Sequence, residues 1–406
     1  MCINQEKGRV ELRVLQEAVV VVTNAFTDHC RKLSVVALIV WGACAPWGNA
    51  VVLPEDSIDV LYHRYDGGGM TIDGPSVLVR KSATPNISVT ANYYVDMVSS
   101  ASVDVIATAS PYEEERTEYG VGVDLLNNKT VMSLGFSQSD ENDFNAKSLH
   151  FTVTQDFFGD LTTLGMGVSK GWDQVGKVGA PDFSEDVDRT HFRLSLAQIL
   201  TKNLLLNANY ELITDQGYLN NPYRQVRYLT EDRSGYDYQA EVYPETRTSN
   251  AFALKGTWFL PYRAAANLQY RYFTDTWGID AHTVETSYVH PFESNWELDL
   301  KYRFYQQSSA SFYADLFPYQ DAQNFLARDK EMSSFSSNTI GLGVTYRFGA
   351  AAGGWVKEGT LSLLYDHMIF TYDDFRDVTQ TGYAPGAEPF YDFSADVTRL
   401  LLTIWY

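Results

Sequence analysis

A two-residue alternation of apolar and polar side chains constrains the fold of this chain more than any other feature. Between Ile87 and Met97 every second residue is apolar, and most of the residues between them are polar. The same alternation recurs at 204–212, 264–272 and 296–304. Successive side chains of a β-strand point to opposite faces, so each stretch predicts a strand with one apolar and one polar face.

Charged residues on the polar faces, such as Glu211, Arg271 and Lys301, decide which kind of β-protein this is. A Lys or Arg that faces lipid at mid-depth costs ~2–4 kcal/mol, and a dry sandwich core does not accept unpaired charges. The apolar face must therefore contact lipid and the polar face a wet or ion-paired interior. Beyond the first fifty residues, no apolar run approaches the ~18 residues of a transmembrane helix, so any crossing is made by strands.

The spacing of the alternating stretches predicts an all-β fold, an antiparallel transmembrane β-barrel of sixteen strands. The first hairpin, around Asp66–Gly69, is the least certain pairing, and omitting it leaves fourteen strands. The predicted strands are 57–65, 71–82, 86–98, 115–126, 129–138, 147–157, 161–171, 189–200, 203–213, 248–259, 263–274, 281–291, 295–306, 336–348, 359–370 and 396–406.

The connections alternate between very short and long. The short ones are expected on the periplasmic side, with both chain ends: Thr84-Pro85-Asn86, Asn127-Asn128, Phe158-Gly159-Asp160, Lys202-Asn203, Pro261-Tyr262, Glu293-Ser294-Asn295 and a turn near Gly353-Gly354. The long ones, Thr214–Thr246, Gln307–Ser334 and Thr371–Ser394, are expected outside the cell. Short turns on one side and long loops on the other are typical of outer-membrane barrels.

The last strand ends in an alternation that resembles the signal read by the barrel-assembly machinery of outer membranes. Leu400, Leu402, Ile404 and Tyr406 share one face, and the chain ends on the aromatic residue. We expect these residues to act as the assembly signal.

Residues 1–50 have the pattern of an export signal. Arg31 and Lys32 precede an apolar run from Leu33 to Ala43, and Gly48-Asn49-Ala50 has small residues where signal peptidase requires them. We predict cleavage after Ala50, which leaves 51–406 as a single barrel domain exported to the outer membrane. Two alternatives remain open, a lipoprotein signal at Cys44 and a true start near Val22. All 3 cysteines precede Ala50, so no disulfide is expected in the barrel.

Composition and motifs exclude several functions. A formal net charge of −20 disfavours nucleic-acid binding. The sequence has no phosphate-binding loop, zinc-protease motif or hydrolase nucleophile elbow, so we expect no cofactor, no metal centre and no enzymatic activity. The nearest hydrolase pairs are His191 with Ser195 and His150 with Ser148, and a structural lumen histidine is the simpler interpretation of each. Carboxylate clusters at 140–143, 182–188 and 372–374 are expected to be solvated loop surface.

Charged residues on the inward faces are the candidate functional residues. They could select ions, or they could pair with one another and close the interior. The candidates are Arg193, Glu211, Lys255, Arg271, Glu285, Lys301, Arg303, Arg347 and Arg399. The loop from Phe312 to Glu331 is too apolar to lie free in solvent, so it is expected to form a constriction, a partner-docking surface or a lid.

From Leu53 onward the chain resembles an outer-membrane family known only as a domain of unknown function. The matching stretches are Leu53–Gly69 (LPEDSIDVLYHRYDGGG), Ala91–Ser100, Gly217–Arg224, Thr274–Thr283 and Asp321–Glu331. Members of the family are encoded beside small lipoproteins, thioredoxin-like proteins and flavin-transfer proteins. The resemblance implies a periplasmic lipoprotein or thioredoxin-like partner. The barrel pattern itself predicts contact with outer-membrane lipid, and the oxygen-rich loops could bind Ca²⁺ or bridge divalent ions to lipopolysaccharide.

Two functional hypotheses follow from these features. The first is a porin-like channel or export pore that works with periplasmic envelope partners, because the polar row is charged and sixteen strands have room for an aqueous lumen. The alternative is a plugged structural scaffold that anchors an envelope redox complex, because the long loops are apolar.

Overall fold

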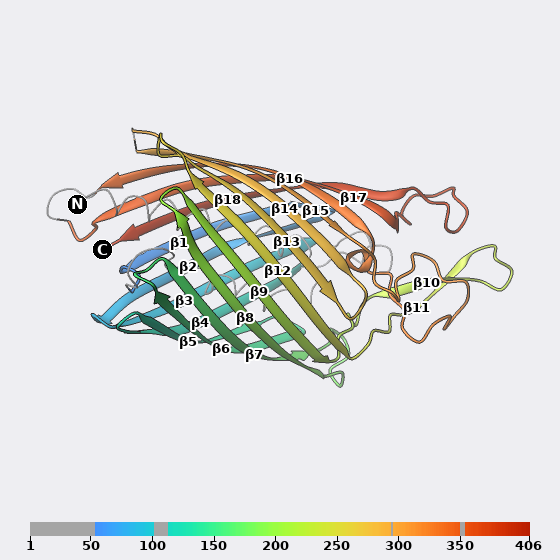
Figure 1. Cartoon of the computed structure of the whole chain (residues 1–406). Coiled ribbons are helices and arrows are strands. Elements are labelled where there is room, and N and C mark those ends of the chain that lie inside the picture. Colours follow the sequence, from blue (N-terminus) through green and yellow to red (C-terminus); the bar gives the residue numbers. More distant parts are fainter. Residues whose placement is uncertain (1–52, 101–112, 294, 350–353) are drawn as a thin grey trace.

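The fold is described from a computed structural model that covers residues 53–100, 113–293, 295–349 and 354–406. Sixteen antiparallel strands close into one barrel, and a two-stranded hairpin stands apart from it (Figure 1). The predicted signal segment, 1–50, lies outside the described residues. The barrel strands are β1 (Ser57–Gly67), β2 (Met70–Thr84), β3 (Ile87–Ser100), β4 (Glu113–Asn127), β5 (Thr130–Asp140), β6 (Phe144–Phe157), β7 (Thr162–Val175), β8 (Glu185–Thr201), β9 (Leu204–Gly217), β12 (Thr246–Phe259), β13 (Ala265–Asp275), β14 (Asp280–Pro291), β15 (Trp296–Gln307), β16 (Phe335–Gly349), β17 (Glu358–Arg376) and β18 (Phe390–Trp405).

Pairing between the first and last strands closes the barrel. β1 pairs with β18 from Ser57↔Trp405 to Gly67↔Ala395, and with β2 on its other side. Gly68 and Gly69, which join β1 to β2, have φ of 59° and 82°. Positive φ at both central residues is what a tight hairpin turn requires, and glycine adopts it without strain. The prediction of sixteen strands is therefore confirmed, including the hairpin whose absence would have left fourteen.

The two ends of the barrel differ as predicted. One end, here called the turn end, carries a series of short connections and Tyr406; the other, the loop end, carries the long connections together with short turns at 68–69 and 276–279 (Figure 1). The loops at the loop end are shorter than predicted because the strands continue pairing beyond the alternating stretches. β17 runs to Arg376 and β18 begins at Phe390, so Tyr372–Asp374 lies in a strand and not in a loop. The hairpin β10 (Gln225–Leu229) and β11 (Tyr236–Ala240) and the 3-10 helix η1 (Lys330–Met332) interrupt the two longest connections.

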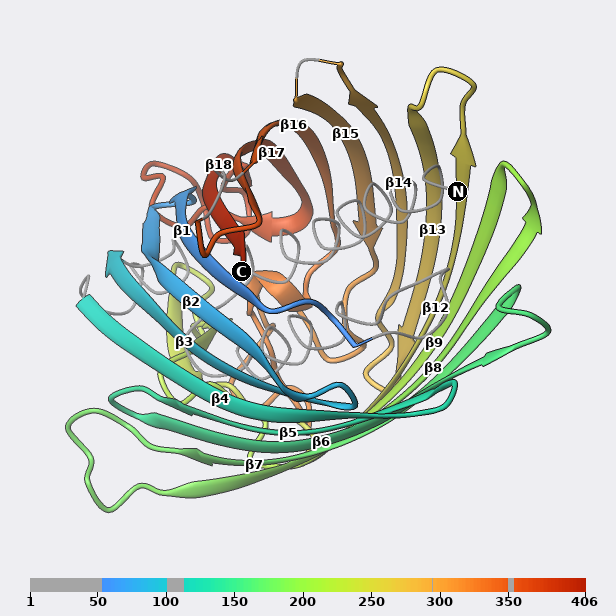
Figure 2. The same cartoon turned by 90° about the vertical axis from the view of Figure 1, so that its left-hand side faces the viewer.

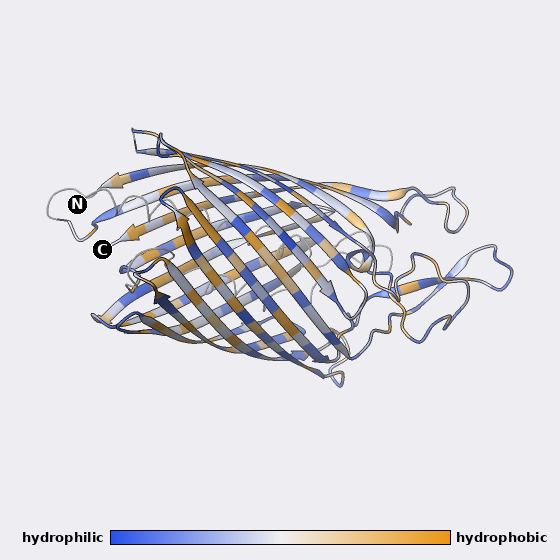
Figure 3. Cartoon of the chain, viewed as in Figure 1, coloured by the Kyte–Doolittle hydropathy of each residue, from blue (hydrophilic) through white to orange (hydrophobic). Residues whose placement is uncertain are grey.

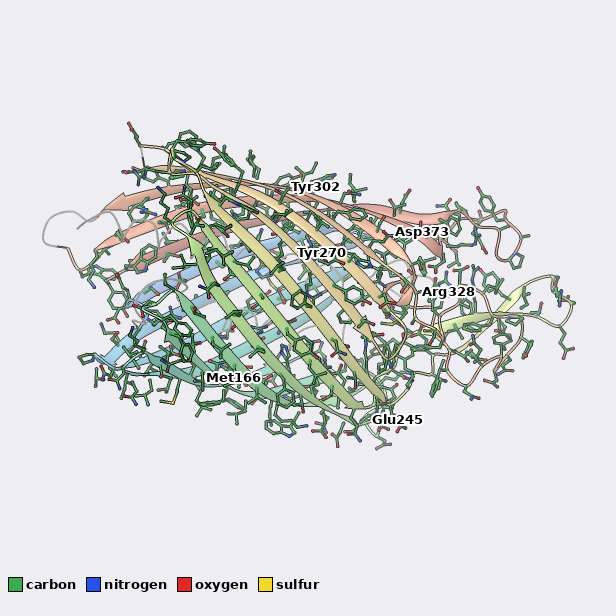
Figure 4. The ribbon with its side chains drawn as sticks, viewed as in Figure 1. Met166, Glu245, Tyr270, Tyr302, Arg328 and Asp373 are labelled. Carbon is green, nitrogen blue, oxygen red and sulfur yellow. The ribbon has the colours of Figure 1, made fainter. Side chains whose placement is uncertain are left out.

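Large apolar side chains cover the outer surface of the barrel. Examples are Val121, Leu134, Met166, Ile340 and Leu363, each more than half exposed. Apolar and polar residues alternate along the strands (Figure 3), and the outward side chains project away from the wall (Figure 4). A soluble protein does not expose an apolar surface of this extent, so the chain is a transmembrane β-barrel with this surface in lipid.

Outward-facing tyrosines mark the limit of the apolar surface toward the loop end. Each donates its hydroxyl to a polar side chain on the neighbouring strand: Tyr119 to Asp140 at 2.8 Å, Tyr210 to Asn250 at 2.7 Å, Tyr302 to Asn338 at 2.8 Å and Tyr365 to Asp396 at 2.5 Å. Tyrosine is enriched at membrane interfaces because its ring is apolar and its hydroxyl polar. These pairs therefore place the interface at their level. Within the described residues, no helix is long and apolar enough to cross a membrane.

Gly341 on β16 provides space for an ion pair inside the barrel. A Cβ at this position would lie 2.4 Å from Asp366 Oδ1 and 2.8 Å from Lys301 Cε. We expect Gly341→Ala to displace these side chains and to lower barrel stability by about 1–3 kcal/mol. The temperature at which the folded form disappears in semi-native electrophoresis measures the change. Gly349→Ala is the control, since nothing lies within 4 Å of a Cβ at that position of the same strand. Equal stability of the two variants would contradict the prediction.

Candidate lumen and external cap

All the charged candidates from the sequence lie on the inward faces of their strands. On every strand concerned, at least one adjacent residue of opposite parity is exposed and apolar, for example Phe192 and Leu194 beside Arg193, and Leu300 and Tyr302 beside Lys301. Arg347 lies at the turn end of β16, where its backbone N–H donates to the Asn295 carbonyl at 2.8 Å. The alternation in the sequence therefore places these charges in the barrel interior.

Carboxylates hold most of these cations in pairs along the wall. Glu211 on β9 contacts Arg193 on β8 at 3.0 Å and Arg271 on β13 at 3.4 Å. Asp366 on β17 contacts Lys301 on β15 at 2.7 Å and Arg399 on β18 at 2.6 Å.

Asp366 was missing from the sequence-derived set. The alternation along β17 could have identified it, because Asp366 lies between the outward-facing Tyr365 and His367 and must therefore face inward. Each pair joins strands that are neighbours or next-neighbours, so the charges line the wall and do not bridge the interior from side to side.

A second ionic cluster, on β1, β3 and β4, was also missed by the sequence analysis. Asp96 contacts the His63 ring at 2.7 Å and Arg116 at 3.2 Å, and Arg116 also contacts Glu118. All four side chains are buried. Asp96 lies in the polar row that identified β3, but no local pattern indicates that His63 lies beside it, because two hairpin turns separate β1 from β3 along the chain.

The candidate hydrolase pairs do not form catalytic contacts. The Ser148 hydroxyl is hydrogen-bonded to that of Ser137 at 2.8 Å, on the neighbouring strand. His191 and Ser195 share the inward face of β8, but four residues of a strand span roughly 13 Å, which is beyond hydrogen-bonding reach. These contacts favour the structural interpretation of both histidines.

The carboxylate clusters also contact protein groups. Asp143 accepts a hydrogen bond from the Tyr223 hydroxyl, and Asp374 Oδ1 accepts one from the Ser334 N–H at 2.8 Å. In the part of the chain that the structure describes, no group of three or more His, Cys, Asp or Glu side chains has the arrangement of a metal site.

Three connections at the loop end form a single packed unit, here called the cap: residues 218–245, 308–334 and 377–389. Leu219, Tyr243, Phe312 and Met332 of the cap belong to one buried apolar cluster with Phe144, Val175 and Val187 of the barrel wall. Those wall residues face inward, so the cap is anchored on the inner surface of β6, β7 and β8. Viewed from the turn end, ribbons of the cap are visible through the barrel at its far opening (Figure 2).

Backbone pairing joins two of the cap segments. Val242 and Leu326 form an antiparallel bridge in which each N–H donates to the other's carbonyl, at 3.0 Å and 2.7 Å. Tyr228 and Phe317 form a parallel bridge, in which the Phe317 N–H donates to the Arg227 carbonyl at 2.9 Å and the Leu229 N–H donates to the Phe317 carbonyl at 3.0 Å. The apolar loop Phe312–Glu331 is therefore ordered against the loop 218–245, which agrees with the expectation that it does not lie free in solvent.

A buried ionic junction connects all three segments of the cap. Arg227 has 0% exposure and contacts Glu388 at 2.6 Å and Asp315 through its other Nη atom. Arg328, at the rim in Figure 4, contacts Asp315 at 3.0 Å and donates to the Arg376 carbonyl at 2.8 Å. Burial opposes ionisation of Glu388, but the Arg227 hydrogen bonds outweigh it and lower the pKa of that carboxyl.

Glu241 is a further buried carboxyl of the cap. It accepts hydrogen bonds from the N–H groups of Arg328 at 2.7 Å and Asp329 at 2.9 Å, and from the Tyr243 hydroxyl at 2.7 Å. Burial, with the negative charge of Asp329 nearby, raises the pKa of Glu241 to about 7. The cap thus contains a hydrogen-bonded polar core in addition to its apolar one.

The predicted assembly residues lie at the seam of the barrel. Leu400, Leu402 and Ile404 face outward opposite Tyr62, Val60 and Ile58 of β1. The Tyr406 hydroxyl donates to the Arg80 carbonyl at 3.2 Å, and the Lys81 ammonium lies 4.6 Å from the centre of its ring.

Comparison with known proteins identifies the family. The family described as "Protein of unknown function (DUF3570)" matches residues 102–365, most of the barrel. The chain belongs to this family. Leu53–Gly69, the first stretch that suggested the resemblance, lies outside the matched region. A search of curated proteins finds no match.

Solved structures of outer-membrane proteins are similar to this chain at low sequence identity. A bacterial polysaccharide outer membrane secretin has TM-score 0.48 and 9% identity, with 87% of this chain and 98% of that chain covered. A Pseudomonas aeruginosa FadL homologue has TM-score 0.42 and 8% identity, with coverage of 87% and 90%. A loop-deletion mutant of OmpT, an outer membrane protein of Vibrio cholerae, has TM-score 0.39 and 9% identity, with coverage of 87% and 98%.

Proposed function

We propose that the protein is an outer-membrane channel or export pore whose external mouth is covered by the cap, and that it has no enzymatic activity. The observation that carries the proposal is the inward row of ion-paired side chains on the wall of a closed barrel. Charged groups that pair along the wall leave the lumen polar, and sixteen strands enclose enough space for an aqueous path. Export to the outer membrane by the signal segment 1–50 is part of the proposal.

Liposome swelling tests the channel. Vesicles containing residues 51–406 without Phe312–Glu331 should swell in isotonic solutions of small sugars much faster than empty vesicles, whereas the intact chain should swell them slowly. Swelling by the deletion variant no faster than by empty vesicles would end the channel proposal.

The second candidate is a plugged scaffold that anchors an envelope redox complex with a periplasmic lipoprotein or thioredoxin-like partner. The specific observation that favours it is the tight packing of the cap, with Arg227 and Glu388 both buried. Mild crosslinking in cells followed by purification should then recover a periplasmic protein with the barrel. Recovery of the barrel alone would count against the scaffold.

We expect the terminal residue to serve assembly, through recognition of the last strand by the barrel-assembly machinery. Tyr406→Ala should lower the amount of folded barrel in the outer membrane several-fold, while refolding of the purified chain in detergent is less affected. Tyr346→Ala is the control, because this outward tyrosine lies near the same end but not in the last strand. Equal losses in cells for both variants would show that Tyr406 has no special part in assembly.

A further inference from the structure

One inward row of register partners crosses β12 to β15. The register aligns Lys255 with Gln269, Gln269 with Glu285, and Glu285 with Arg303. Neighbouring strands lie ~4.8 Å apart, so the row extends across a short arc of the wall. Lys301 lies two residues before Arg303, on the same face of β15.

Arg303 has no ion partner among the residues the structure describes, whereas Arg193, Arg271 and Arg399 each contact a carboxylate. Its Nε and Nη1 atoms are buried and form no hydrogen bond. Glu285 lies directly opposite Arg303 in register, but in the described part of the chain the two side chains form no hydrogen bond or ion pair with each other. Buried guanidinium groups are normally paired, so an unpaired one marks a position where a partner is missing.

Neighbouring carboxylates are already engaged by other cations. Asp366 binds Lys301 at 2.7 Å and Arg399 at 2.6 Å. Glu211 binds Arg193 at 3.0 Å and Arg271 at 3.4 Å. Two carboxylates, Glu285 and Asp366, act electrostatically on Arg303, but Asp366 is the one already paired with two cations. Lys301 and Lys255 lie within the same electrostatic range of Glu285, and Arg271 acts on Arg303 as a further cation. Positive charge therefore exceeds negative charge around Arg303.

We propose that Arg303 is the centre of an oxyanion-binding site in the lumen, for the carboxylate or phosphate group of a small solute. A planar guanidinium with two free N–H directions suits bidentate binding of such a group, and Lys301 and Lys255 add attraction. Glu285 sets the strength of binding, because its charge repels the same ligand. The inference deepens the proposed function by naming the class of solute, and it rests on that function only for the solute's path.

A binding measurement tests the site independently of transport. The unfolding temperature of residues 51–406 in detergent is measured in increasing inorganic phosphate, since a ligand that binds the folded state stabilises it. The native chain should be stabilised. Arg303→Gln should weaken the apparent phosphate affinity by about tenfold or more, and Glu285→Gln should strengthen it by a similar factor. Arg64→Gln removes an equal charge from an exposed residue and should behave as the native chain.

Each outcome decides the question. Phosphate dependence that is the same in the native chain, Arg303→Gln and Arg64→Gln would reflect general salt effects and overturn the site. If Arg303→Gln does not fold, the opposite-sign effect of Glu285→Gln still tests the proposal, because loss of a merely structural carboxyl would not raise phosphate affinity. Phosphate stabilisation without liposome swelling would keep the site and reject the channel, and swelling without phosphate stabilisation would do the reverse.

Discussion

Removal of Phe312–Glu331 is expected to change a barrel that conducts almost no ions into one with a large, steady ion conductance. In planar bilayers, the conductance of residues 51–406 should rise by about tenfold or more, because the deletion removes the cap segment that pairs with 218–245 and contacts Arg227, and sixteen strands enclose room for a water-filled lumen. Ser308–Ser311 and Met332–Ser334 remain to join β15 to β16, whose last pair, Gln307↔Phe335, is unchanged. The barrel should therefore keep its folded mobility in semi-native electrophoresis.

A matched control separates the cap from loop length in general. Shortening the tip of the β10–β11 hairpin, residues 230–235, removes exposed residues and leaves the packed part of the cap intact, so the conductance should stay low. High conductance in the intact chain would show that the cap does not close the mouth.

Substitution of Arg227 by alanine is expected to release the cap without unfolding the barrel. The substitution leaves Glu388 buried without its cation and takes one of two arginines from Asp315. Breaking a buried pair in this way costs about 3–5 kcal/mol. Because the barrel strands keep their own hydrogen bonds, the cost should fall on the cap, and its amides should exchange hydrogen about a hundredfold faster or more.

Hydrogen exchange resolved by peptide gives the measurement for this variant. Segments 218–245, 308–334 and 377–389 should lose protection together, while peptides from β12 to β16 should not change. Arg64→Ala is the comparison, because its pair with Asp66 at 3.3 Å is exposed to solvent and exposed pairs contribute little. Unchanged protection of the cap in Arg227→Ala would mean that the apolar clusters alone hold it.

The fold could be predicted from local sequence pattern. The alternation at Ile87–Met97 and similar stretches specifies a strand and the face that meets lipid, because both depend only on neighbouring residues. Strand count, the short turns and the inward position of residues such as Arg193 and Lys301 follow from the same periodicity. Strand ends were less predictable: β17 extends to Arg376 because backbone pairing continues where the lipid-driven alternation stops.

Ionic partners and the cap required the tertiary structure. Lys301 reaches Asp366 across Gly341 only because the registers of β15, β16 and β17 align these residues, and no local pattern encodes register between strands. Arg227 and Glu388 are 161 residues apart in the chain and meet where two loops fold together. The sequence by itself thus determined the barrel, since membrane and strand geometry repeat along the chain; the pairing of charges and the closing of the mouth were decided by long-range contacts.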